Sequence, residues 1–569
     1  MEAKSPSADL ERLQKLQEYA LAIAAEHNPE KSMAHILWAL KDITQADGGT
    51  FYSLQKHHLV FELMLGASLT NNSAAKNKIK PLPLYGEDGR PNKSNIACRC
   101  ALTGEVINVA NIALNKDFNF TGVHRIEELT GKKTQSLLAI PLKTNDHQVL
   151  GVIELSMASK DGAPGICFAQ EDVDAARFLG MHAAITLSNY RLNQDLQQLF
   201  FSMAEVLAYA IDNKSYYTGK HCHRVPEIAM LLLDEVLKNP PPSLTNFKLN
   251  EDQIQEMRLA ALLHDCGKVT TPAHIMDKAF KLETIFDRVN LIATRFEILK
   301  RDAYVAYLKK KAEIIQGTAK PPLTPPMETA IKDARRELMK AVTHYNDDLE
   351  FIKRINRGVE SMADEDKARL AKIAGYKMQG LDGQEISFLT EDELKNLAIN
   401  RGTLTDEERK IINNHIVVTL EMLNQMKFPA NLKNIPEIAG SHHERVDGRG
   451  YPRGLKGNQM SPQAKILAIA DTFEALTAND RPYRQGNTIQ ESLEIMGKMT
   501  VEGHFDPDLF TAFIDGEVYL KFAKEHLKPE QYAHIDLSKI TGYILPENRD
   551  KTSTLYFARQ DVSGQKKAA

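Results

Sequence analysis

The stretch Leu262-Leu263-His264-Asp265-Cys266-Gly267-Lys268 joins an apolar helical segment to a histidine and an aspartate. A helix that ends in this way delivers an imidazole and a carboxylate from the rim of a hydrophobic core. Adjacent helical residues point about 100° apart, so the two side chains can bind neighbouring metal ions. Alternatively, one side chain can bridge two ions while the other caps a single ion. A His-Asp pair alone is weak evidence, because a chain with 18 histidines contains about one by chance.

Histidine and aspartate recur in similar surroundings at four further places, namely His221, His415, the pair His442-His443, and Asp471. Asp471 is the sharpest of these, because it follows the apolar run at residues 466–470, where a buried carboxylate needs a cation as partner. For any one of these residues, a helix-end position or an ion pair with arginine is an equal alternative. Packing alone explains the whole set poorly.

The candidate ligands are histidines and carboxylates without thiolates, which favours iron or manganese and leaves zinc and nickel as alternatives. So many ligands predict two or more divalent ions. A paired site of this kind suits phosphoester cleavage, because it lowers the pKa of bound water toward about 7 and holds the attacking and leaving oxygens across roughly 3.5–4 Å. Lys268, one turn beyond His264, can place a cation against a phosphate oxygen; a solvated helix-end lysine is the alternative.

These residues resemble the HD-GYP subgroup of the HD-domain phosphohydrolases, through His264-Asp265-x-Gly267-Lys268 and His442-His443-Glu444-x-x-Asp447-Gly448-x-Gly450-Tyr451-Pro452. The resemblance covers residues 200–520 and implies hydrolysis of cyclic di-GMP to pGpG, with onward hydrolysis to GMP left open. It implies two or three metal ions, held by seven ligands: His221, His264, Asp265, His415, His442, His443 and Asp471. Asp265 and Lys268 would be catalytic. The nucleotide would be bound by Lys268, Arg481, Arg484, Gly450, Tyr451 and Pro452.

Three departures from the family pattern stand out. The connector from His264 to His415 is longer than usual, and it contains two charged, helix-favouring stretches, 283–316 and 327–356, on either side of a proline-rich segment. Because proline cannot continue a helix, we predict an inserted antiparallel helical hairpin. The segment before Arg481 is one residue longer than the common family form. For Arg481 and Arg484, a place in a surface turn is therefore the alternative to binding the nucleotide. Asp212 stands where many relatives carry glutamate, and its role stays open.

The first 190 residues alternate between helix and strand patterns. We predict a helix at residues 9–26, strands at 49–54 and 59–66, and a hairpin of strands 136–142 and 149–157. The region looks like a GAF domain, a small-molecule sensor fold, in residues 118–120, 126–141 and 151–155. This resemblance implies an unidentified small ligand, with a nucleotide as one candidate, or a domain that serves only as a dimer platform.

Between the two regions, six apolar residues follow a spacing of 4, 3, 4, 3 and 4: Leu192, Leu196, Leu199, Met203, Val206 and Ala210. This heptad pattern covers under three heptads, whereas three to four make a coiled coil convincing. A helix packed on its own domain and a dimer-forming connecting helix fit it equally well. A homodimer is the expected assembly.

The expected fold is therefore multidomain. An N-terminal α/β GAF domain (1–190) and a connecting helix (191–211) precede an all-α HD-GYP domain (212–545) with a helical insertion at about 280–400; a flexible tail (546–569) follows. The net charge of -4 over 569 residues disfavours a nucleic-acid binder driven by bulk positive charge, so no DNA partner is expected. No segment approaches 18 uninterrupted apolar residues and the first residues do not form a secretory signal, so we expect a cytoplasmic protein without a membrane partner. Five scattered cysteines are expected to be reduced thiols.

The favoured function is a cyclic di-GMP phosphodiesterase regulated by its GAF domain. One alternative is hydrolysis of another phosphoester, such as a different cyclic dinucleotide. The other is a receptor or docking module with little turnover, which would bind the dinucleotide or a diguanylate cyclase through Gly450-Tyr451-Pro452. The complete ligand set argues against the second alternative.

Overall fold

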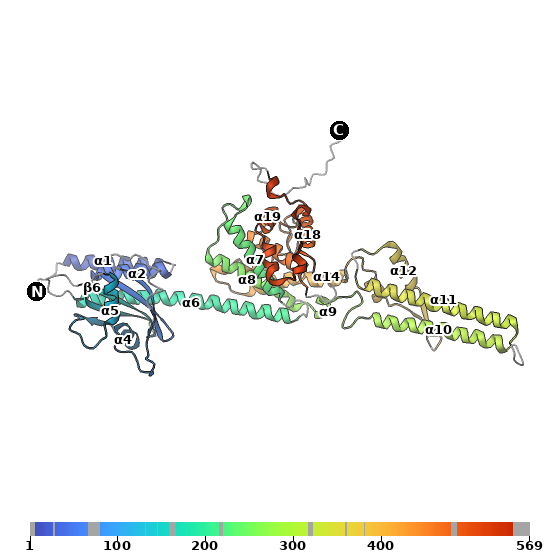
Figure 1. The fold of residues 1–569 in the computed structure, drawn as a ribbon, viewed down its shortest axis with the longest axis horizontal. Coiled ribbons are helices and arrows are strands. Elements are labelled where there is room, and N and C mark those ends of the chain that lie inside the picture. The colour runs from blue at the N-terminus through green and yellow to red at the C-terminus, as the bar shows by residue number, and fades with distance from the viewer. Residues whose placement is uncertain are drawn as a thin grey trace, which may run out of the picture. The chain divides into compact units, whose positions relative to one another are not determined.

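A computed structural model describes residues 6–26, 29–65, 80–130, 133–144, 146–158, 167–214, 220–316, 323–358, 361–380, 382–479 and 486–549. The chain divides into two compact units, Met1–Phe200 and Phe201–Ala569. Helix α6 (Gln170–Lys214) is continuous, so the domain boundaries expected after residues 190 and 211 both fall inside it (Figure 1). No helix among the described residues is long and apolar enough to cross a membrane.

The first unit is an α/β domain, as predicted, built on one antiparallel sheet with the strand order β3-β2-β1-β6-β5-β4. The strands are β1 (Gly48–Gln55), β2 (His58–Leu65), β3 (Leu82–Pro83), β4 (Ile107–Val109), β5 (Thr134–Lys143) and β6 (Val149–Ala158). Its helices are α1 (Pro6–Ala25), α2 (Pro29–Thr44), α4 (Ile96–Thr103), α5 (Thr121–Thr130) and the first part of α6. The four predicted strands and the β5–β6 hairpin are confirmed; Asn145, in the predicted turn, lies outside the described residues.

Both faces of this sheet are buried, which explains the uninterrupted apolar run in β5. Leu138, Ile140 and Leu142 pack into one core with α1, α2 and α6. Leu137 and Ala139 pack into a second core with α4. Because successive strand residues point to opposite faces, a strand covered on both sides needs apolar residues at every position.

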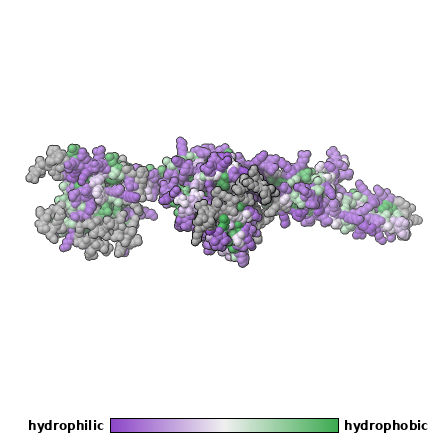
Figure 2. All heavy atoms as spheres, turned by 90° about the horizontal axis from the view of Figure 1, so that it is seen from above, coloured by the Kyte–Doolittle hydropathy of each residue, from purple (hydrophilic) through white to green (hydrophobic). Residues whose placement is uncertain are grey.

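The second unit is almost entirely helical, as predicted. Its main helices are α7 (His221–Lys238), α8 (Glu251–Leu263), α9 (Ala273–Met276), α14 (Asp406–Asn413), α15 (His415–Gln425), α16 (Ile435–Ala439), α17 (Pro462–Thr477), α18 (Ile489–Val501), α19 (Pro507–Asp515), α20 (Val518–His526) and α21 (Pro529–Tyr532). Short 3-10 turns lie at η1 (Pro242–Leu244), η2 (Cys266–Thr270), η3 (Ala430–Leu432), η4 (Gly457–Gln459), η5 (Leu537–Lys539) and η6 (Pro546–Asn548). In Figure 2, hydrophobic residues show only as small separate patches on the visible surface of this helical unit.

An inserted subdomain follows α9, and α10 (Val289–Gln316) runs back along α11 (Pro325–Asn356) as the predicted antiparallel hairpin (Figure 1). It continues through α12 (Asp364–Ala374) and α13 (Glu391–Leu397) and has its own core, centred on Phe296, Phe351 and Phe388. Two short paired strands, β7 (Lys377–Gln379) and β8 (Glu385–Ser387), contradict the expectation that this region is purely helical. Gly383 has a φ of 80° in the turn between them, a conformation that glycine adopts without strain.

The segment expected to be a flexible tail begins with ordered contacts. Residues Pro546–Asn548 form η6, and Arg549 makes an ion pair with Asp515, at 2.7 Å. Residues 550–569 lie outside the described part of the chain.

Candidate metal centre

Helix ends and turns deliver most of the predicted ligands. His221 begins α7, His264 follows the last residue of α8, and His415 begins α15. The pair His442-His443 lies in the turn after α16, while Asp471 lies within α17. Segments far apart in the sequence thus meet at one place.

Asp265 is buried at the centre of this cluster, and its two carboxylate oxygens face different histidines. Oδ2 lies 3.1 Å from Nε2 of His221 and 3.2 Å from Nε2 of His264. Oδ1 lies 3.2 Å from Nε2 of His415 and 4.0 Å from Nε2 of His442. Two ligand atoms each about 2.1 Å from one ion lie roughly 3 Å apart when they meet it at a right angle. Each oxygen of the Asp265 carboxylate therefore lies at ligand spacing from a different set of histidine nitrogens.

The ring orientation of three histidines is set by backbone carbonyls. Nδ1 of His264 donates to the carbonyl oxygen of Ala261 at 2.7 Å, and Nδ1 of His442 donates to that of Ala439 at 2.6 Å. Nδ1 of His415 donates in the same way to the carbonyl oxygen of Ile412. In the neutral form of each ring, Nε2 then carries a free lone pair. Among the described residues, these three Nε2 atoms and Oδ1 of Asp265 are buried without a hydrogen-bond partner. Buried polar atoms are almost always paired, so converging orphan lone pairs fit a bound metal ion.

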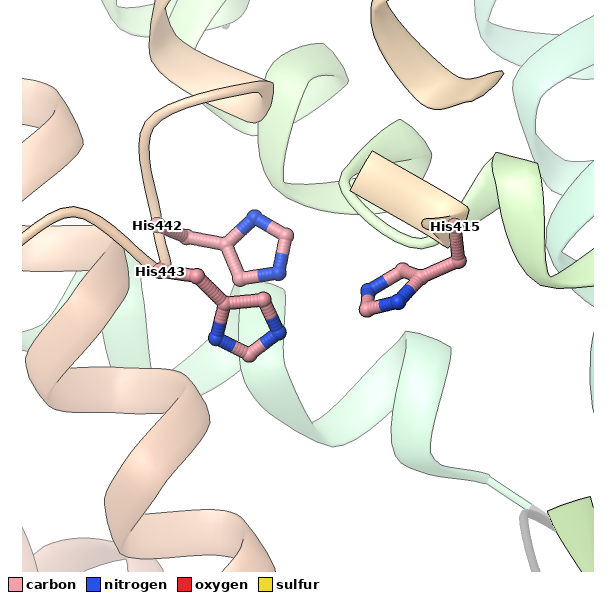
Figure 3. Close-up of side chains that lie close together, drawn as sticks. All are labelled: His415, His442 and His443. Carbon is pink, nitrogen blue, oxygen red and sulfur yellow. The ribbon is translucent and has the colours of Figure 1, made fainter. Parts of the chain in front are cut away.

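The donor atoms form two groups, each with all its atoms within 4.8 Å of one another. One group is His221, His264 and Asp471; the other is His415, His442 and His443. In Figure 3, His442 and His443 come from one turn and His415 comes from a facing helix, and the three rings lie around a common space. His264, Asp265 and His442 form a third such group, which links the first two. All seven predicted ligands are thus brought together.

The electrostatics of the site keep its carboxylates ionised. Burial opposes the charge of Asp265, but the Lys268 ammonium and the surrounding histidines outweigh it and hold the pKa of Asp265 well below its ordinary value. Burial also opposes the charge of Asp471, but contacts with His221 and His264 hold its pKa well below the ordinary value. Burial lowers the pKa of His443 to about 4, whereas Asp265 and Asp471 outweigh burial and raise the pKa of His264 to about 9. A neutral imidazole and an ionised carboxylate are the forms that bind metal.

Lys268 reaches the centre of the site from η2. Its Nζ lies 2.6 Å from Oδ2 of Asp265, and its side chain is partly exposed. Burial opposes the cation, but the carboxylates of Asp265 and Asp471 raise the pKa of Lys268 above its ordinary value. A permanent positive charge therefore borders the predicted metal positions.

Gly267 permits the close approach that brings His415 to Asp265. A Cβ atom on Gly267 would lie 2.0 Å from the carbonyl oxygen of His415 and 2.6 Å from the amide nitrogen of Thr419. No side chain fits there, so the first turn of α15 packs directly against the backbone of η2.

The Gly450-Tyr451-Pro452 segment folds against the histidines. The Tyr451 ring stacks on the His443 ring with centroids 4.9 Å apart, and the Tyr451 N–H donates to His443 O at 3.2 Å. A Cβ on Gly450 would lie 2.4 Å from Cα of Glu444, so this turn requires glycine. Pro452 follows in the same turn. Arg481 and Arg484 lie outside the described residues.

Two acidic residues support the beginning of α7. Asp212 accepts hydrogen bonds from the backbone N–H groups of Lys220 and Cys222, at 3.2 and 3.3 Å. Both its oxygens are thus engaged by the backbone at the start of the helix. Oε2 of Glu474 lies 2.6 Å from Nδ1 of His221. Its other oxygen, Oε1, lies 2.6 Å from Nε of Arg224.

Sequence analysis missed Glu474, although a signal was available. Glu474 lies three residues after Asp471 on α17, and residues three apart share one face of a helix. A carboxylate behind a metal-binding histidine fixes the orientation of its ring.

Two family models match this chain, and both are described as HD domain. They match residues 218–374 and residues 388–509. The first range contains His221, His264 and Asp265, and the second contains His415, the His442-His443 pair and Asp471. Both matched ranges lie within the second unit of this chain. The gap between the two matches of the HD domain spans β7 and β8.

Curated relatives that are similar to part of this chain are named as phosphodiesterases. A 3'3'-cGAMP-specific phosphodiesterase of Vibrio cholerae is 34% identical over 151 residues, or 26% of this chain and 28% of the relative. A cyclic di-GMP phosphodiesterase of Pseudomonas aeruginosa is 37% identical over 113 residues, 20% of this chain and 26% of the relative. Another from Thermotoga maritima is 26% identical over 255 residues, 41% of this chain and 62% of the relative. The chain thus spans between about a quarter and three fifths of these relatives.

Solved structures of GAF domains are similar to part of the chain at low identity. The GAF domain of a phosphoenolpyruvate-protein phosphotransferase from Coxiella burnetii matches with 16% identity and a TM-score of 0.27, covering 32% of this chain and 96% of that one. A GAF domain/HD domain protein from Geobacter sulfurreducens matches with 15% identity and a TM-score of 0.23, covering 29% of this chain and 95% of that one.

Proposed function

We propose that the HD domain belongs to the HD-GYP subgroup and is a metal-dependent phosphodiesterase that hydrolyses cyclic di-GMP to pGpG and onward to GMP. The observation that carries the proposal is the Asp265 carboxylate, which presents one oxygen to each of two groups of histidines. The names of the Pseudomonas and Thermotoga relatives support the substrate.

Two divalent ions would be held by the two ligand groups, with Asp265 shared between them. The absence of thiolates from both groups favours iron or manganese. When bound, such ions activate water and stabilise the charge that develops on a phosphate. A third ion would need ligands in addition to these two groups.

The chain's own residues would bind and orient the nucleotide. Lys268 keeps its proton beside Asp265 and would donate to a non-bridging phosphate oxygen. Gly450, Tyr451 and Pro452 border the histidines and would contact the nucleotide, as would Arg481 and Arg484 by the family resemblance. Glu474 would hold the His221 ring with Nε2 toward the metal.

A different cyclic dinucleotide is the second candidate substrate. It is favoured by the Vibrio relative, whose name specifies 3'3'-cGAMP. The ligand groups select for a phosphoester and not for a base, so both substrates fit the described site. A receptor with little turnover, or a docking site for a diguanylate cyclase, is less favoured because no predicted ligand is missing.

The first unit would have a regulatory role, as a GAF-type sensor of an unidentified small ligand. The protein would be located in the cytoplasm and would form a homodimer. The five cysteines are free thiols in the structure, which suits a reducing compartment.

The test is elemental analysis of anaerobically purified protein together with a hydrolysis assay on cyclic di-GMP, 3'3'-cGAMP and bis(p-nitrophenyl) phosphate. Wild type should contain about two ions per chain and should hydrolyse cyclic di-GMP fastest. Asp265→Ala should lose both the ions and the activity, while the exposed control Asp234→Ala should keep them. An Asp265→Ala protein that retains metal and turnover would refute the mechanism. Metal without turnover of any substrate would favour the receptor.

A further inference from the structure

Lys214, the last residue of α6, contacts the turn that carries Lys268. Its Nζ donates to the carbonyl oxygen of Lys268 at 3.2 Å and also to that of Val269. Both acceptors belong to η2 and lie 54 and 55 residues away along the chain. A carbonyl oxygen has two lone pairs, and a lysine ammonium near the end of a helical segment is a suitable donor to them. Lys214 therefore holds the backbone of η2 at the residue whose side chain reaches Asp265.

The residues just before Lys268 are held by a different element, α15. The Gly267 N–H donates to Oγ1 of Thr419 at 2.9 Å, and this hydroxyl donates to the carbonyl oxygen of His264 at 3.3 Å. Thr419 is fully buried, so these contacts are shielded from water. The backbone of η2 is thus fixed by α15 on the N-terminal side of Lys268 and contacted by α6 on the C-terminal side.

The end of α6 is itself fixed, so it can support η2. Ala208 and Ile211 are buried, and the buried carboxylate of Asp212 accepts hydrogen bonds from the backbone at the start of α7. Fixing a long lysine side chain costs rotamer entropy, and two acceptors at once offset this cost. The Lys214 ammonium therefore extends from an immobile backbone to a second backbone segment.

We propose that Lys214 is a positioning residue for Lys268, because it holds η2 so that the Lys268 ammonium stays beside Asp265 and meets the substrate phosphate. The kinetic consequence rests on the phosphodiesterase function proposed above, whereas the contact between α6 and η2 does not. The two hydrogen bonds of Lys214 go to backbone carbonyls and not to the side chain of a predicted ligand. Loss of these bonds should therefore leave the metal ions in place.

A small movement of η2 is enough to change turnover. The Lys268 ammonium lies 2.6 Å from Oδ2 of Asp265 and is carried by a long, flexible side chain, so a rotation of its backbone displaces the ammonium further than the Cα atom. A misplacement of about 1 Å in an active site can reduce the rate about 100-fold. Because Lys268 would act on charge that develops in the transition state, the loss should appear in kcat and not in KM.

The first test is a double-mutant cycle with cyclic di-GMP as substrate. Lys214→Met retains most of the side-chain length and removes the donors, and it should lower kcat about 10-fold with KM and metal content unchanged. Lys214→Arg can still donate to both carbonyls and should retain most of the activity. In a Lys268→Met background, Lys214→Met should change kcat by less than about twofold, because the group that it positions is absent.

The exposed control Lys524→Met on α20 should have the kcat of wild type. Equal losses from Lys214→Met in both backgrounds would overturn the inference, because Lys214 would then act independently of Lys268. A wild-type kcat in Lys214→Met would overturn it as well. So would a loss of the ions from this variant, since Lys214 would then support the whole site and not Lys268 alone.

The second test does not depend on turnover. Hydrogen exchange, measured by mass spectrometry in a peptide of residues 264–271, includes the Thr271 N–H, which donates to the carbonyl oxygen of Lys268 at 3.1 Å. Lys214→Met should speed exchange in this peptide several-fold, while a peptide from α15 should exchange as in wild type. Unchanged exchange in residues 264–271 would overturn the inference. Faster exchange, together with a wild-type protein that hydrolyses none of the substrates, would support the positioning of η2 and refute the proposed phosphodiesterase function.

Discussion

Glu474 lies directly behind His221, with Oε2 2.6 Å from Nδ1 of the imidazole. Nδ1 of His264, His415 and His442 is held by backbone carbonyls instead. Of these four histidines, His221 is therefore the one whose orientation a single side-chain substitution can release. The same carboxylate contacts Arg224, which ties it in place from the other side.

Glu474→Ala should weaken one of the two metal positions about 10- to 100-fold, because losing a carboxylate that orients a ligand histidine typically has this effect. The measurement is metal affinity by competition with a chelator. The exposed control Glu421→Gln on α15 should bind metal like wild type. An unchanged affinity in Glu474→Ala would show that the His221 ring is held by other contacts.

His221→Ala and His415→Ala should each remove about one metal equivalent, because the two histidines belong to different ligand groups. Asp265→Ala should remove more than either, since its carboxylate is shared. Metal content per chain, determined by elemental analysis of protein loaded with manganese, measures all three. Equal losses in the three variants would contradict two separate positions.

Gly267→Ala should destabilise the second unit and reduce its metal content together. The added Cβ would lie 2.0 Å from His415 O, so α15 must move away and carry His415 with it. Overpacking of this kind costs about 1–3 kcal/mol. Calorimetry and metal analysis provide the measurements. Gly122→Ala, where a Cβ meets nothing within 4 Å, is the control and should be neutral or stabilising.

The first unit should lose stability as the pH rises from about 4.5 to about 7. Burial raises the pKa of Glu154 on β6 from 4.5 to about 7, against an opposing hydrogen bond from Tyr52. Between these values the folded state binds more protons than the unfolded state, so the free energy of unfolding falls with pH, by up to about 3 kcal/mol. Above pH 7 this dependence ends.

Urea unfolding followed by the fluorescence of Trp38, the only tryptophan, reports on this unit because Trp38 lies on α2. Glu154→Gln should abolish the loss between pH 4.5 and 7, whereas the exposed Glu105→Gln should retain it. A wild-type stability that is constant over this range would contradict a half-buried, protonated Glu154.

Local patterns in the sequence predicted the elements whose periodicity is unbroken. The strands β1, β2, β5 and β6 and the hairpin of α10 and α11 were found because apolar runs and a proline-rich break are local signals. The strands β7 and β8 were missed because three residues each are too short to show a period. Glu474 and Asp212 were left unassigned because the sequence does not show which backbone or side-chain groups each carboxylate contacts in the folded chain.

The sequence by itself identified the candidate ligands, because several apolar segments that each deliver a histidine or an aspartate are poorly explained by packing alone. Only the tertiary structure decided how they are grouped. Distance and direction in space depend on packing, such as the approach of α15 that Gly267 permits, and on which ring nitrogen a backbone carbonyl occupies. The exposure of Leu192, Leu199 and Val206 on α6 is likewise a property of the folded chain, since a heptad spacing is the same whether its residues lie inside a domain or outside it.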